Sequence, residues 1–347
     1  MIDYIIVGLG LAGVSFCEQL ERNDKTFKVI NDDSQTSSKV AGGMYNPVIL
    51  KRFTLAWMAK EQLEIALPLY CGLERKLQTK FNYTIPVLRR FATMGEQNLW
   101  FEASDKAGLD YFLSDEILAN KNVAIDAPFG YGQVLYTGRI DTKKLLSTFG
   151  EYLLKQNKLI EETFDYDALR IEEGHVEYKS VKAKRIVFAE GFGLRKNPYF
   201  KYLPLQGTKG ELLTIRAPSL KEANVIKASV FSIPLGDDLY RVGATYKWKD
   251  KTNLPTEEAK EELLAKLNAF LRCDYEVVDH VAGIRPTVTD RMPLVGRHLE
   301  HKNLYVLNGF GSRGVMVGPY AAKQLFDAIE HRIPINKKMN IERFAIH

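Results

Sequence analysis

Three segments of the chain begin as a run of apolar residues and end in glycine. They are residues 2–8, 185–193 and 303–311. Short uninterrupted apolar runs are typical of strands that are buried on both faces, as in a parallel sheet. The glycines that follow predict tight turns with exposed backbone at the ends of these strands.

Helical spacing of apolar residues follows the first and the last of these strands. Residues 14–22 lead to a second apolar run at residues 27–30, so residues 2–30 are predicted to form a β-α-β unit. Residues 318–331 place apolar side chains on one helical face. The C-terminal end of the chain is therefore expected to return to the N-terminal domain, which makes that domain discontinuous.

A different pattern fills the middle of the chain. Residues 211–217, 225–235 and 239–245 are rich in β-branched and aromatic residues, and a Gly-Asp-Asp turn at residues 236–238 joins the last two. Such a turn is typical of a hairpin, so a second, antiparallel sheet is predicted here. The helices expected beside it are residues 256–272 and residues 56–77, the latter with a kink near Pro68.

The composition is that of an ordinary globular protein with room for two domains. The chain has 347 residues, of which 46% are hydrophobic and 26% charged, and its net charge of +5 is spread along its length. A nucleic-acid partner is permitted but not indicated. The three cysteines lie far apart, which disfavours a disulfide framework or a redox dithiol, and no metal site is expected.

The N-terminal residues run directly into the first strand, without the basic start and cleavage site of a signal peptide. No apolar run approaches the ~20 residues that cross a bilayer. We therefore expect a cytoplasmic protein without a transmembrane span; its oligomeric state is left open.

The strongest motif is a glycine loop between the first strand and the first helix. Residues 8–13 read G-L-G-L-A-G, which is G-x-G-x-x-G in the strand-to-helix context that the motif requires. Gly8 permits the turn, Gly10 lets a pyrophosphate approach the backbone, and Gly13 allows close helix packing. The amides of Leu11 and Ala12 lie at the helix N-terminus, whose dipole favours phosphate charge.

The end of the second strand carries the candidate ribose ligands. An acidic residue is expected there, and the sequence reads Asn31-Asp32-Asp33. Asn31 stands at the position where the motif places its acidic residue, and its side chain can bond a hydroxyl. Asp32 or Asp33 could do so after a one-residue change in the turn. Asn31 and Asp32 are weighted equally, and the two carboxylates argue against a ligand with a 2′-phosphate.

A second loop of small residues distinguishes between dinucleotides. Residues 37–44 read S-S-K-V-A-G-G-M and lie just past the second strand. An NAD enzyme has little use for such a loop, whereas the isoalloxazine ring of a flavin needs backbone to pack on and to bond its edge. The loop therefore favours FAD. The candidate contacts are Ser37, Ala41, Gly42, Gly43, Met44 and, at the end of a later strand, Gly191.

Two segments near the C-terminus carry a resemblance to a known family. Residues 282–296 read AGIRPTVTDRMPLVG, and residues 308–315 read NGFGSRGV at the start of a helix. With the glycine loop and residues 42–47 (GGMYNP), they are similar to the D-amino-acid oxidase family of FAD enzymes, which includes glycine and sarcosine oxidases. The GSRG and GMYNP forms most resemble the oxidase half of a bifunctional bacterial enzyme that modifies wobble uridine in tRNA, without its methyltransferase half.

The resemblance implies roles for two arginines. Arg285 matches the family's arginine that salt-bridges the substrate carboxylate, a task that suits a bidentate guanidinium. Arg313 would lie beside the flavin and contact either the carboxylate or the ring. Backbone amides would face the N1–C2=O edge of the flavin, where negative charge develops on reduction. They belong to Gly311, Ser312, Arg313, Gly314 and Val315.

Other positions depart from the family pattern. Phe231 stands where glycine oxidase has a tyrosine three residues before a strand proline, here Pro234, so one bond to the carboxylate would be missing. Arg241 stands where sarcosine oxidase places its oxygen-activating lysine, although an ordinary sheet residue fits this position as well. No histidine–cysteine arrangement for a covalent flavin is evident, so noncovalent FAD is expected. Weaker candidates are Tyr45 and Tyr246 as pocket walls, His280 as a base, and Lys51 and Arg52 as anion contacts.

The expected fold class is α/β, with a discontinuous, Rossmann-like doubly wound FAD-binding domain and a second domain built on an antiparallel sheet. The FAD-binding domain would comprise residues 1–50, 140–205 and 280–347. Residues 51–139 and 206–279 would form the substrate domain.

The function that the resemblance implies is FAD-dependent oxidation of the C–N bond of an amino acid or secondary amine that carries a carboxylate, by hydride transfer to flavin N5. A neutral amine needs no side-chain base, and the electron acceptor, oxygen or another, is left open. One alternative is the same chemistry on a carboxymethylaminomethyl group of tRNA, with Lys51, Arg52, Lys247 and Lys249 on phosphates. Another is a flavin-binding module without turnover. A reductase that uses both FAD and NAD(P)H lacks a second glycine loop and a dithiol.

Overall fold

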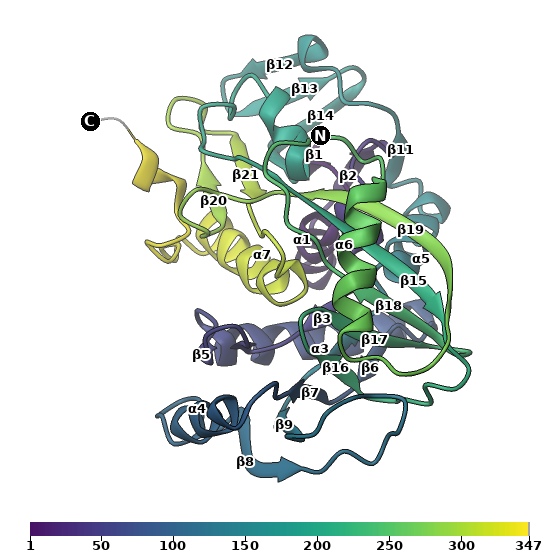
Figure 1. The fold of residues 1–347 in the computed structure, drawn as a ribbon. Coiled ribbons are helices and arrows are strands. Elements are labelled where there is room, and N and C mark those ends of the chain that lie inside the picture. Colours follow the sequence, from purple (N-terminus) through teal and green to yellow (C-terminus); the bar gives the residue numbers. More distant parts are fainter. Residues whose placement is uncertain (346–347) are drawn as a thin grey trace.

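The fold is built on two eight-stranded sheets, which lie one above the other in Figure 1. The computed structural model describes residues 1–345. The first sheet consists of β1 (Ile2–Val7), β2 (Phe27–Asn31), β11 (Leu159–Glu161), β12 (Leu169–Glu172), β13 (His175–Tyr178), β14 (Val181–Phe188), β20 (Leu294–Arg297) and β21 (Leu304–Asn308). The second consists of β7 (Val87–Arg90), β8 (Leu113–Leu118), β9 (Tyr131–Val134), β15 (Thr208–Arg216), β16 (Val225–Lys227), β17 (Phe231–Gly236), β18 (Leu239–Gly243) and β19 (Glu276–Arg285).

Smaller elements complete the chain. The short strands are β3 (Met44–Tyr45), β4 (Val48–Ile49), β5 (Thr54–Leu55), β6 (Asn82–Thr84) and β10 (Gly138–Ile140). The helices are α1 (Leu11–Arg22), α2 (Ser37–Val40), α3 (Ala59–Leu77), α4 (Met94–Ser104), α5 (Thr142–Lys155), α6 (Glu257–Asn268) and α7 (Gly314–Glu330). Three 3-10 helices are η1 (Tyr166–Ala168), η2 (Gly191–Lys196) and η3 (Ile341–Phe344).

The first sheet is parallel at its centre. Strands β2, β1, β14 and β21 are neighbours in that order and run parallel, which confirms the β-α-β unit predicted for the N-terminus. Alternate residues of β1 face different layers, because successive side chains of a strand point to opposite faces. Tyr4 and Ile6 pack with helices α1, α5 and α7, whereas Ile5 and Val7 pack against the antiparallel strands β12 and β13.

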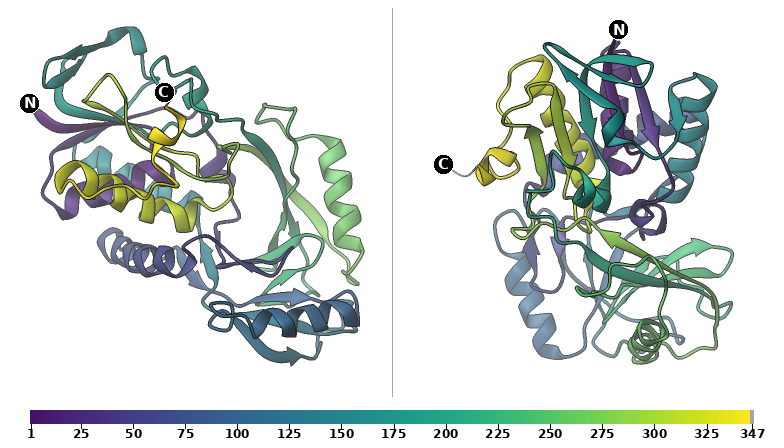
Figure 2. Two further views of the ribbon diagram at one scale, coloured as in Figure 1. Left: turned by 90° about the vertical axis from the view of Figure 1, so that its left-hand side faces the viewer. Right: turned by 90° about the horizontal axis from the view of Figure 1, so that it is seen from above.

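Helix α7, from the C-terminal part of the chain, lies beside α1 under the first sheet (Figure 2). It runs through Pro319, which has no N–H to donate to the carbonyl of Val315. The hydroxyl of Tyr70 in α3 donates to this carbonyl instead, at 2.8 Å. Helix α3 likewise continues through Pro68 as one helix. The C-terminal segment thus returns to the N-terminal sheet.

The second sheet is antiparallel except where β16 pairs with β7. Its β17–β18 hairpin turns at Asp237 and Asp238, whose φ values of +51° and +57° are those of a turn matched to the twist of a hairpin. The antiparallel meander predicted for this region is confirmed, although residues 225–235 divide into two strands. Helix α6 packs on one face of the sheet, and the opposite face is turned toward the first sheet.

The placement of the domain boundaries stays a prediction, and strand β19 runs through the expected boundary at residue 280. Among residues 1–345, no helix is both long and apolar enough to span a membrane. The cytoplasmic location also stays a prediction.

Candidate active site

The glycine loop folds tightly between β1 and α1. Gly8 has φ +98°, and a Cβ there would lie 2.5 Å from the carbonyl oxygen of Ala189 at the end of β14. A Cβ on Gly13 would overlap the carbonyl oxygen of Gly8. Within the described chain, the amides of Ala12 and Gly13 have no hydrogen-bond acceptor. The first turn of α1 therefore offers free donors and a favourable dipole to a pyrophosphate.

Residues 37–40 are not the flexible loop that the sequence suggested. They form the short helix α2, in which the carbonyl of Thr36 accepts hydrogen bonds from the amides of Lys39 and Val40 at 2.8 and 3.1 Å. The hydroxyl of Ser38 accepts from the amide of Leu11 at 3.3 Å. This helix therefore packs directly against the glycine loop near Gly10, and only residues 41–43 lie outside helix and strand before β3.

The ribose candidates lie at the end of β2, as expected. Asn31 Oδ1 accepts a hydrogen bond of 2.8 Å from the amide of Leu9, so this side chain holds the glycine loop, and its Nδ2 is free to donate to a ligand. Asp32 Oδ1 accepts from the amide and the hydroxyl of Ser34 at 3.1 and 2.6 Å. Asp33 pairs with Lys39. The choice among Asn31, Asp32 and Asp33 stays open.

Glu190 is a residue of this region that the sequence analysis missed. It lies two residues after the end of β14, beside Gly8. Its carboxylate accepts hydrogen bonds from the hydroxyl of Tyr166 and, at 2.8 Å, from Asn197 Nδ2. Burial, and to a smaller extent the charge of Asp32, raise the pKa of Glu190 against the lowering effect of the two donors, to a value of about 7. A carboxyl group that titrates near neutral pH thus lies next to the glycine loop.

Replacing Glu190 with glutamine should change how stability depends on pH. The pKa of Glu190 is about 7 in the folded protein, above the ordinary 4.5, because the fold favours the neutral carboxyl group. The neutral group therefore contributes fully to the free energy of unfolding below pH 4.5, and this contribution is lost as the pH rises through 7. Glutamine stays neutral and avoids this loss. The free energy of unfolding should be measured in urea without added FAD. The value for Glu190→Gln minus that for the wild type should therefore increase as the pH rises from about 5 to about 8. A difference that does not vary with pH would show that Glu190 is ionised throughout.

The N-terminus of α7 provides a second set of backbone donors. The amides of Gly311 and Arg313 donate to the carbonyls of Pro286 and Phe310, at 3.0 and 3.1 Å, so these two amides are not free to face a flavin as the sequence analysis expected. The amides of Gly314 and Val315 have no acceptor in the part of the chain that the structure describes. Gly191 and Gly311 both have positive φ, and no atom lies within 4 Å of a Cβ built on either. Open space therefore borders these two strand ends.

The face of the second sheet that is turned toward the first sheet carries three glycines. Directly opposed residues of antiparallel strands point to the same face, so Gly210 and its partner Gly283 share this face. Leu212 is two residues from Gly210 on β15, so it points to the same face. Its partner on β18 is Gly243, which therefore belongs to this face as well. We call this surface the glycine face.

Residues of the second loop pack onto the glycine face. A Cβ on Gly42 would lie 2.9 Å from Ile233 Cδ1, and a Cβ on Gly283 would lie 2.7 Å from Val40 Cγ2. Gly43, with φ +72°, allows the chain to turn into β3, where a Cβ would overlap the carbonyl of Ile140. The glycines thus allow α2 and the loop after it to approach the second sheet closely.

Arg285 ends β19, and its guanidinium lies over Gly210, where a Cβ would overlap it. Its Nη1 donates to the carbonyl of Thr245 at 3.2 Å, and its guanidinium carbon is 4.3 Å from the ring centre of Tyr246. No acidic side chain of residues 1–345 pairs with it, and burial lowers its pKa. A partly buried cation with unused donors is suited to an anionic ligand.

Arg313 follows a turn that contacts the end of β19, since the amide of Gly311 donates to the carbonyl of Pro286, the residue after Arg285, at 3.0 Å. Its Nη1 is buried without a hydrogen-bond partner among the described residues. Burial lowers its pKa, the phenol of Tyr246 raises it, and Arg291 lowers it. The backbone segments that carry the two arginines singled out by the sequence therefore meet, although the arginines are more than twenty residues apart in the chain.

The other predicted substrate contacts divide into two groups. Phe231 lies opposite Gly243, and Arg241 lies two residues from Gly243 on the same strand, so both belong to the glycine face. Arg241 Nη1 is 3.6 Å from Asp279 Oδ2. Tyr45, by contrast, is 3% exposed and packs over Gly138 in the core, so its role as a pocket wall stays a prediction without support from its position.

The expectation that His280 could act as a base does not fit its position. It lies opposite Leu213, on the face that α6 covers, and its Nε2 is 3.1 Å from Glu211 Oε2. Residues of alternate parity on β19 point to opposite faces, so His280 points away from Arg285. Lys51 and Arg52 are exposed in the turn between β4 and β5.

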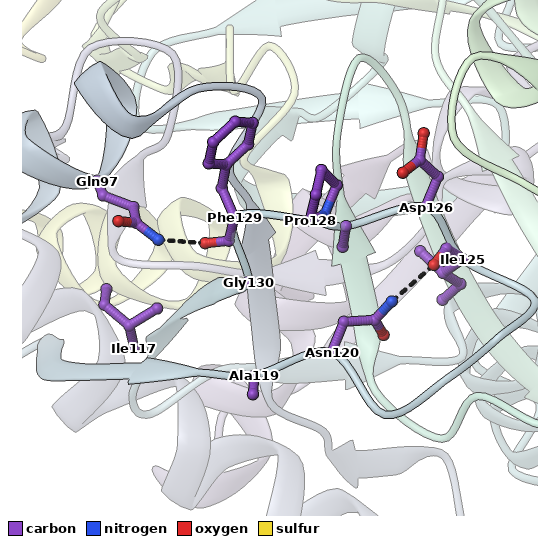
Figure 3. Close-up of a pocket in the computed structure, with 10 residues that line it drawn as sticks. Gln97, Ile117, Ala119, Asn120, Ile125, Asp126, Pro128, Phe129 and Gly130 are labelled. Atoms are coloured by element: carbon purple, nitrogen blue, oxygen red, sulfur yellow. Dashed lines mark hydrogen bonds between the residues drawn. The ribbon is translucent and has the colours of Figure 1, made fainter.

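A hollow of about 550 Å³ lies at the far edge of the second sheet, between β8, β9 and α4 (Figure 3). Its two amide side chains bond to backbone in its own wall, with Gln97 donating to the carbonyl of Phe129 and Asn120 to that of Ile125, and Asp126 pairs with Arg272 at 2.6 Å. None of the predicted site residues lines it. No group of three or more residues suited to hold a metal occurs among residues 1–345.

The chain belongs to the DAO family of FAD dependent oxidoreductases, whose family model matches residues 3–328. It is therefore an oxidoreductase with FAD as its cofactor. The residues fit this group, because the Ala12 and Gly13 amides, the open space at Gly191 and Gly311, and the free amides of α7 provide a place for it.

Particular relatives share parts of this chain. A glycine oxidase from Pseudomonas aeruginosa is 26% identical over 45% of this chain and 44% of its own length. A tRNA 5-methylaminomethyl-2-thiouridine biosynthesis bifunctional protein MnmC from Aromatoleum aromaticum is 27% identical over 44% of this chain and 28% of its own length. The matches thus span less than half of either curated relative.

The fold is shared with solved structures over nearly the whole chain. Glycine oxidase from Bacillus cereus has a TM-score of 0.79 at 21% identity and covers 96% of both chains. Iminodiacetate oxidase from a Chelativorans species has a TM-score of 0.79 at 18% identity and covers 97% of this chain and 99% of its own. These likenesses confirm the α/β fold class.

Proposed function

We propose that this protein oxidises the C–N bond of an amino acid or secondary amine that carries a carboxylate, with FAD held noncovalently. The observation that carries the proposal is Arg285, a partly buried guanidinium over Gly210 that no acidic residue of the described chain neutralises. A substrate carboxylate would complete a charge-assisted, bidentate pair with it. Such a pair fixes the substrate by its carboxylate and leaves the amine end free.

The chain's own residues then have distinct tasks. The amides of Ala12 and Gly13 hold the pyrophosphate, and those of Gly314 and Val315 supply donors where negative charge develops. When bound, FAD accepts the two electrons of the oxidation. The substrate loses a hydride from the carbon and a proton from the neutral amine, and water hydrolyses the resulting imine to a carbonyl compound and an amine. Oxygen or another acceptor reoxidises the cofactor.

The direct test is the visible spectrum of the purified, FAD-loaded protein. Anaerobic addition of glycine, sarcosine, proline or D-amino acids should bleach the flavin band with one of these amines. A protein that shows no flavin band after FAD is supplied would contradict the proposal at its first step. A band that every free amine leaves unchanged would contradict the proposed small-molecule substrate.

A second candidate substrate is a carboxymethylaminomethyl group on tRNA, held through the same Arg285. It is favoured by the exposed aromatic residues beside the site, since Tyr246 is 53% and Trp248 47% exposed and such side chains stack on bases. Lys247, however, pairs with Glu258 at 2.6 Å, and the Nζ of Lys251 donates to backbone. Anaerobic bleaching by tRNA, with binding that weakens steeply as salt rises, would favour this candidate.

A further inference from the structure

A lysine is completely buried behind the glycine face. Lys209 is 0% exposed and precedes Gly210 on β15, so its side chain points to the face opposite the one on which Arg285 lies. A lysine is almost never buried in this way without partners, because its ammonium group is costly to remove from water. The partners of this side chain therefore indicate what it holds.

The ammonium of Lys209 binds one segment of the chain at three points. It donates to the carboxylate of Asp250, to the carbonyl of Leu254 and, at 3.4 Å, to the hydroxyl of Thr252. The buried carboxylate of Glu211 lies 3.4 Å from the same nitrogen. The ammonium lowers the pKa of Asp250 to about 2, so this pair stays ionised at neutral pH.

The segment that Lys209 binds joins β18 to α6, and we call its residues 245–255 the strap. At its start, the backbone of Lys247 pairs with that of Lys209 in both directions, at 2.9 and 3.0 Å. Within the described chain, residues 248–255 make no hydrogen bond between backbone groups. Side chains therefore hold the outer part of the strap, and Lys209 supplies bonds to three of its residues.

The start of the strap holds the guanidinium of Arg285. The carbonyl of Thr245 accepts from Arg285 Nη1 at 3.2 Å, and the ring of Tyr246 packs on the guanidinium carbon at 4.3 Å. Gly210, on the other side, only leaves room for this group. A displacement of the strap would therefore move the group that we expect to bind the substrate carboxylate.

The other end of the strap reaches the domain of the first sheet. Asn253 Nδ2 donates to the carbonyl of Ser34 at 3.4 Å, and the Nζ of Lys251 lies 6.0 Å from the ring centre of Phe192. Ser34 follows the ribose candidates at the end of β2, and Phe192 follows Gly191. The strap thus extends from the substrate arginine to residues beside the expected cofactor site.

We propose that Lys209 is a positioning residue for the substrate carboxylate, because it fixes the strap whose first residues hold the guanidinium of Arg285. It does so from behind the sheet, without touching the substrate. This inference rests on the proposed function, since it concerns the carboxylate site of the same reaction.

The first test separates substrate binding from turnover. Asp250→Ala removes the carboxylate that Lys209 binds. For the FAD-loaded variant, KM for the best amine of the panel should rise roughly 10-fold, the scale of one lost charge-assisted hydrogen bond, with kcat nearly unchanged. The control is Asp126→Ala, which removes an equally exposed carboxylate, 37% against 36%, from its pair with Arg272 and should keep the KM of the wild type.

A double variant shows whether the anchor acts through Tyr246. Tyr246→Ala alone should raise KM, and adding Asp250→Ala should raise KM no further, because changes in one connected set of contacts are not additive. Asp250→Ala is preferred to Lys209→Met, which would leave Glu211 buried without its ammonium partner. Equal factors in KM with and without Tyr246 would overturn the proposal. So would an Asp250→Ala variant whose melting temperature falls while KM stays at the value of the wild type.

Cleavage by trypsin tests the anchor without any amine. Lys249 and Lys251 are exposed in the strap, and exposed segments are cut when they open locally. The rate of cleavage after these lysines should rise roughly 10-fold in Asp250→Ala, again the scale of one charged hydrogen bond, and should not change in Asp126→Ala. An unchanged rate in Asp250→Ala would overturn the inference whether or not an amine is oxidised. Failure of every amine to bleach the flavin would instead overturn the proposed function and the role of Lys209 toward its substrate, while the cleavage rates still decide whether Lys209 anchors the strap.

Discussion

Replacing Arg285 with lysine is expected to lower kcat/KM for the carboxylate-bearing amine by roughly 30- to 5000-fold, the equivalent of the ~2–5 kcal/mol that a disrupted buried charge pair costs. Lysine keeps the charge but loses the planar fork that binds a carboxylate with two parallel bonds. It also loses the stacking on Tyr246, which lies 4.3 Å from the guanidinium carbon.

Steady-state kinetics with the best amine of the panel would measure this effect. The flavin spectrum and FAD affinity of Arg285→Lys should match those of the wild type, because the free amides of the cofactor site lie on α1 and α7. A matched control is Arg297→Lys, on the exposed side of β20. Wild-type turnover in Arg285→Lys would remove Arg285 from the site.

Replacing Gly13 with alanine should abolish tight FAD binding and destabilise the fold. The added methyl group would overlap the carbonyl oxygen of Gly8, so α1 or the glycine loop must move. Overpacking of this kind costs about 1–3 kcal/mol. The displacement also moves the Ala12 and Gly13 amides that we expect to face the pyrophosphate. Titration with FAD should show an affinity at least ~10-fold weaker, for ~1.4 kcal/mol of lost binding.

Gly150 provides the matched control, because it is also a glycine inside a helix. A Cβ at Gly150 would meet only Leu9 Cδ2, at 3.9 Å, which is an ordinary contact. Gly150→Ala should therefore raise the free energy of unfolding by about 0.5–1 kcal/mol through helix propensity. Equal FAD affinities for Gly13→Ala and Gly150→Ala would show that the tight turn at Gly8 does not form the cofactor site.

The fold was largely predictable because its signals are local. The apolar run before Gly8 and the Gly-Asp-Asp turn predict a parallel strand and a hairpin from a few neighbouring residues each. The helix at Ser37–Val40 was missed because small residues and glycines resemble a loop, and the bonds to the Thr36 carbonyl appear only in the folded chain. The strands β12 and β13 were missed because short, partly charged strands resemble surface loops.

The sequence could predict which residues belong to the site but not where their side chains lie relative to one another. The family resemblance singled out Arg285 and Arg313, but strand register places the first over Gly210, and register depends on contacts between distant segments. Register also places His280 on the opposite face from Arg285. Glu190 interrupts an apolar run just before Gly191, and this local signal could have identified it.

The glycine face has a consequence for how this protein can change its substrate range. An added Cβ would overlap Arg285 at Gly210, lie 2.8 Å from Leu212 at Gly243, and lie 2.7 Å from Val40 at Gly283. Evolution or laboratory selection therefore has little freedom at these backbone positions. Accepted mutations should instead gather at Phe231 and Arg241 on β17 and β18. Among descendants of this sequence, these two side chains would therefore change faster than the three glycines of the same face.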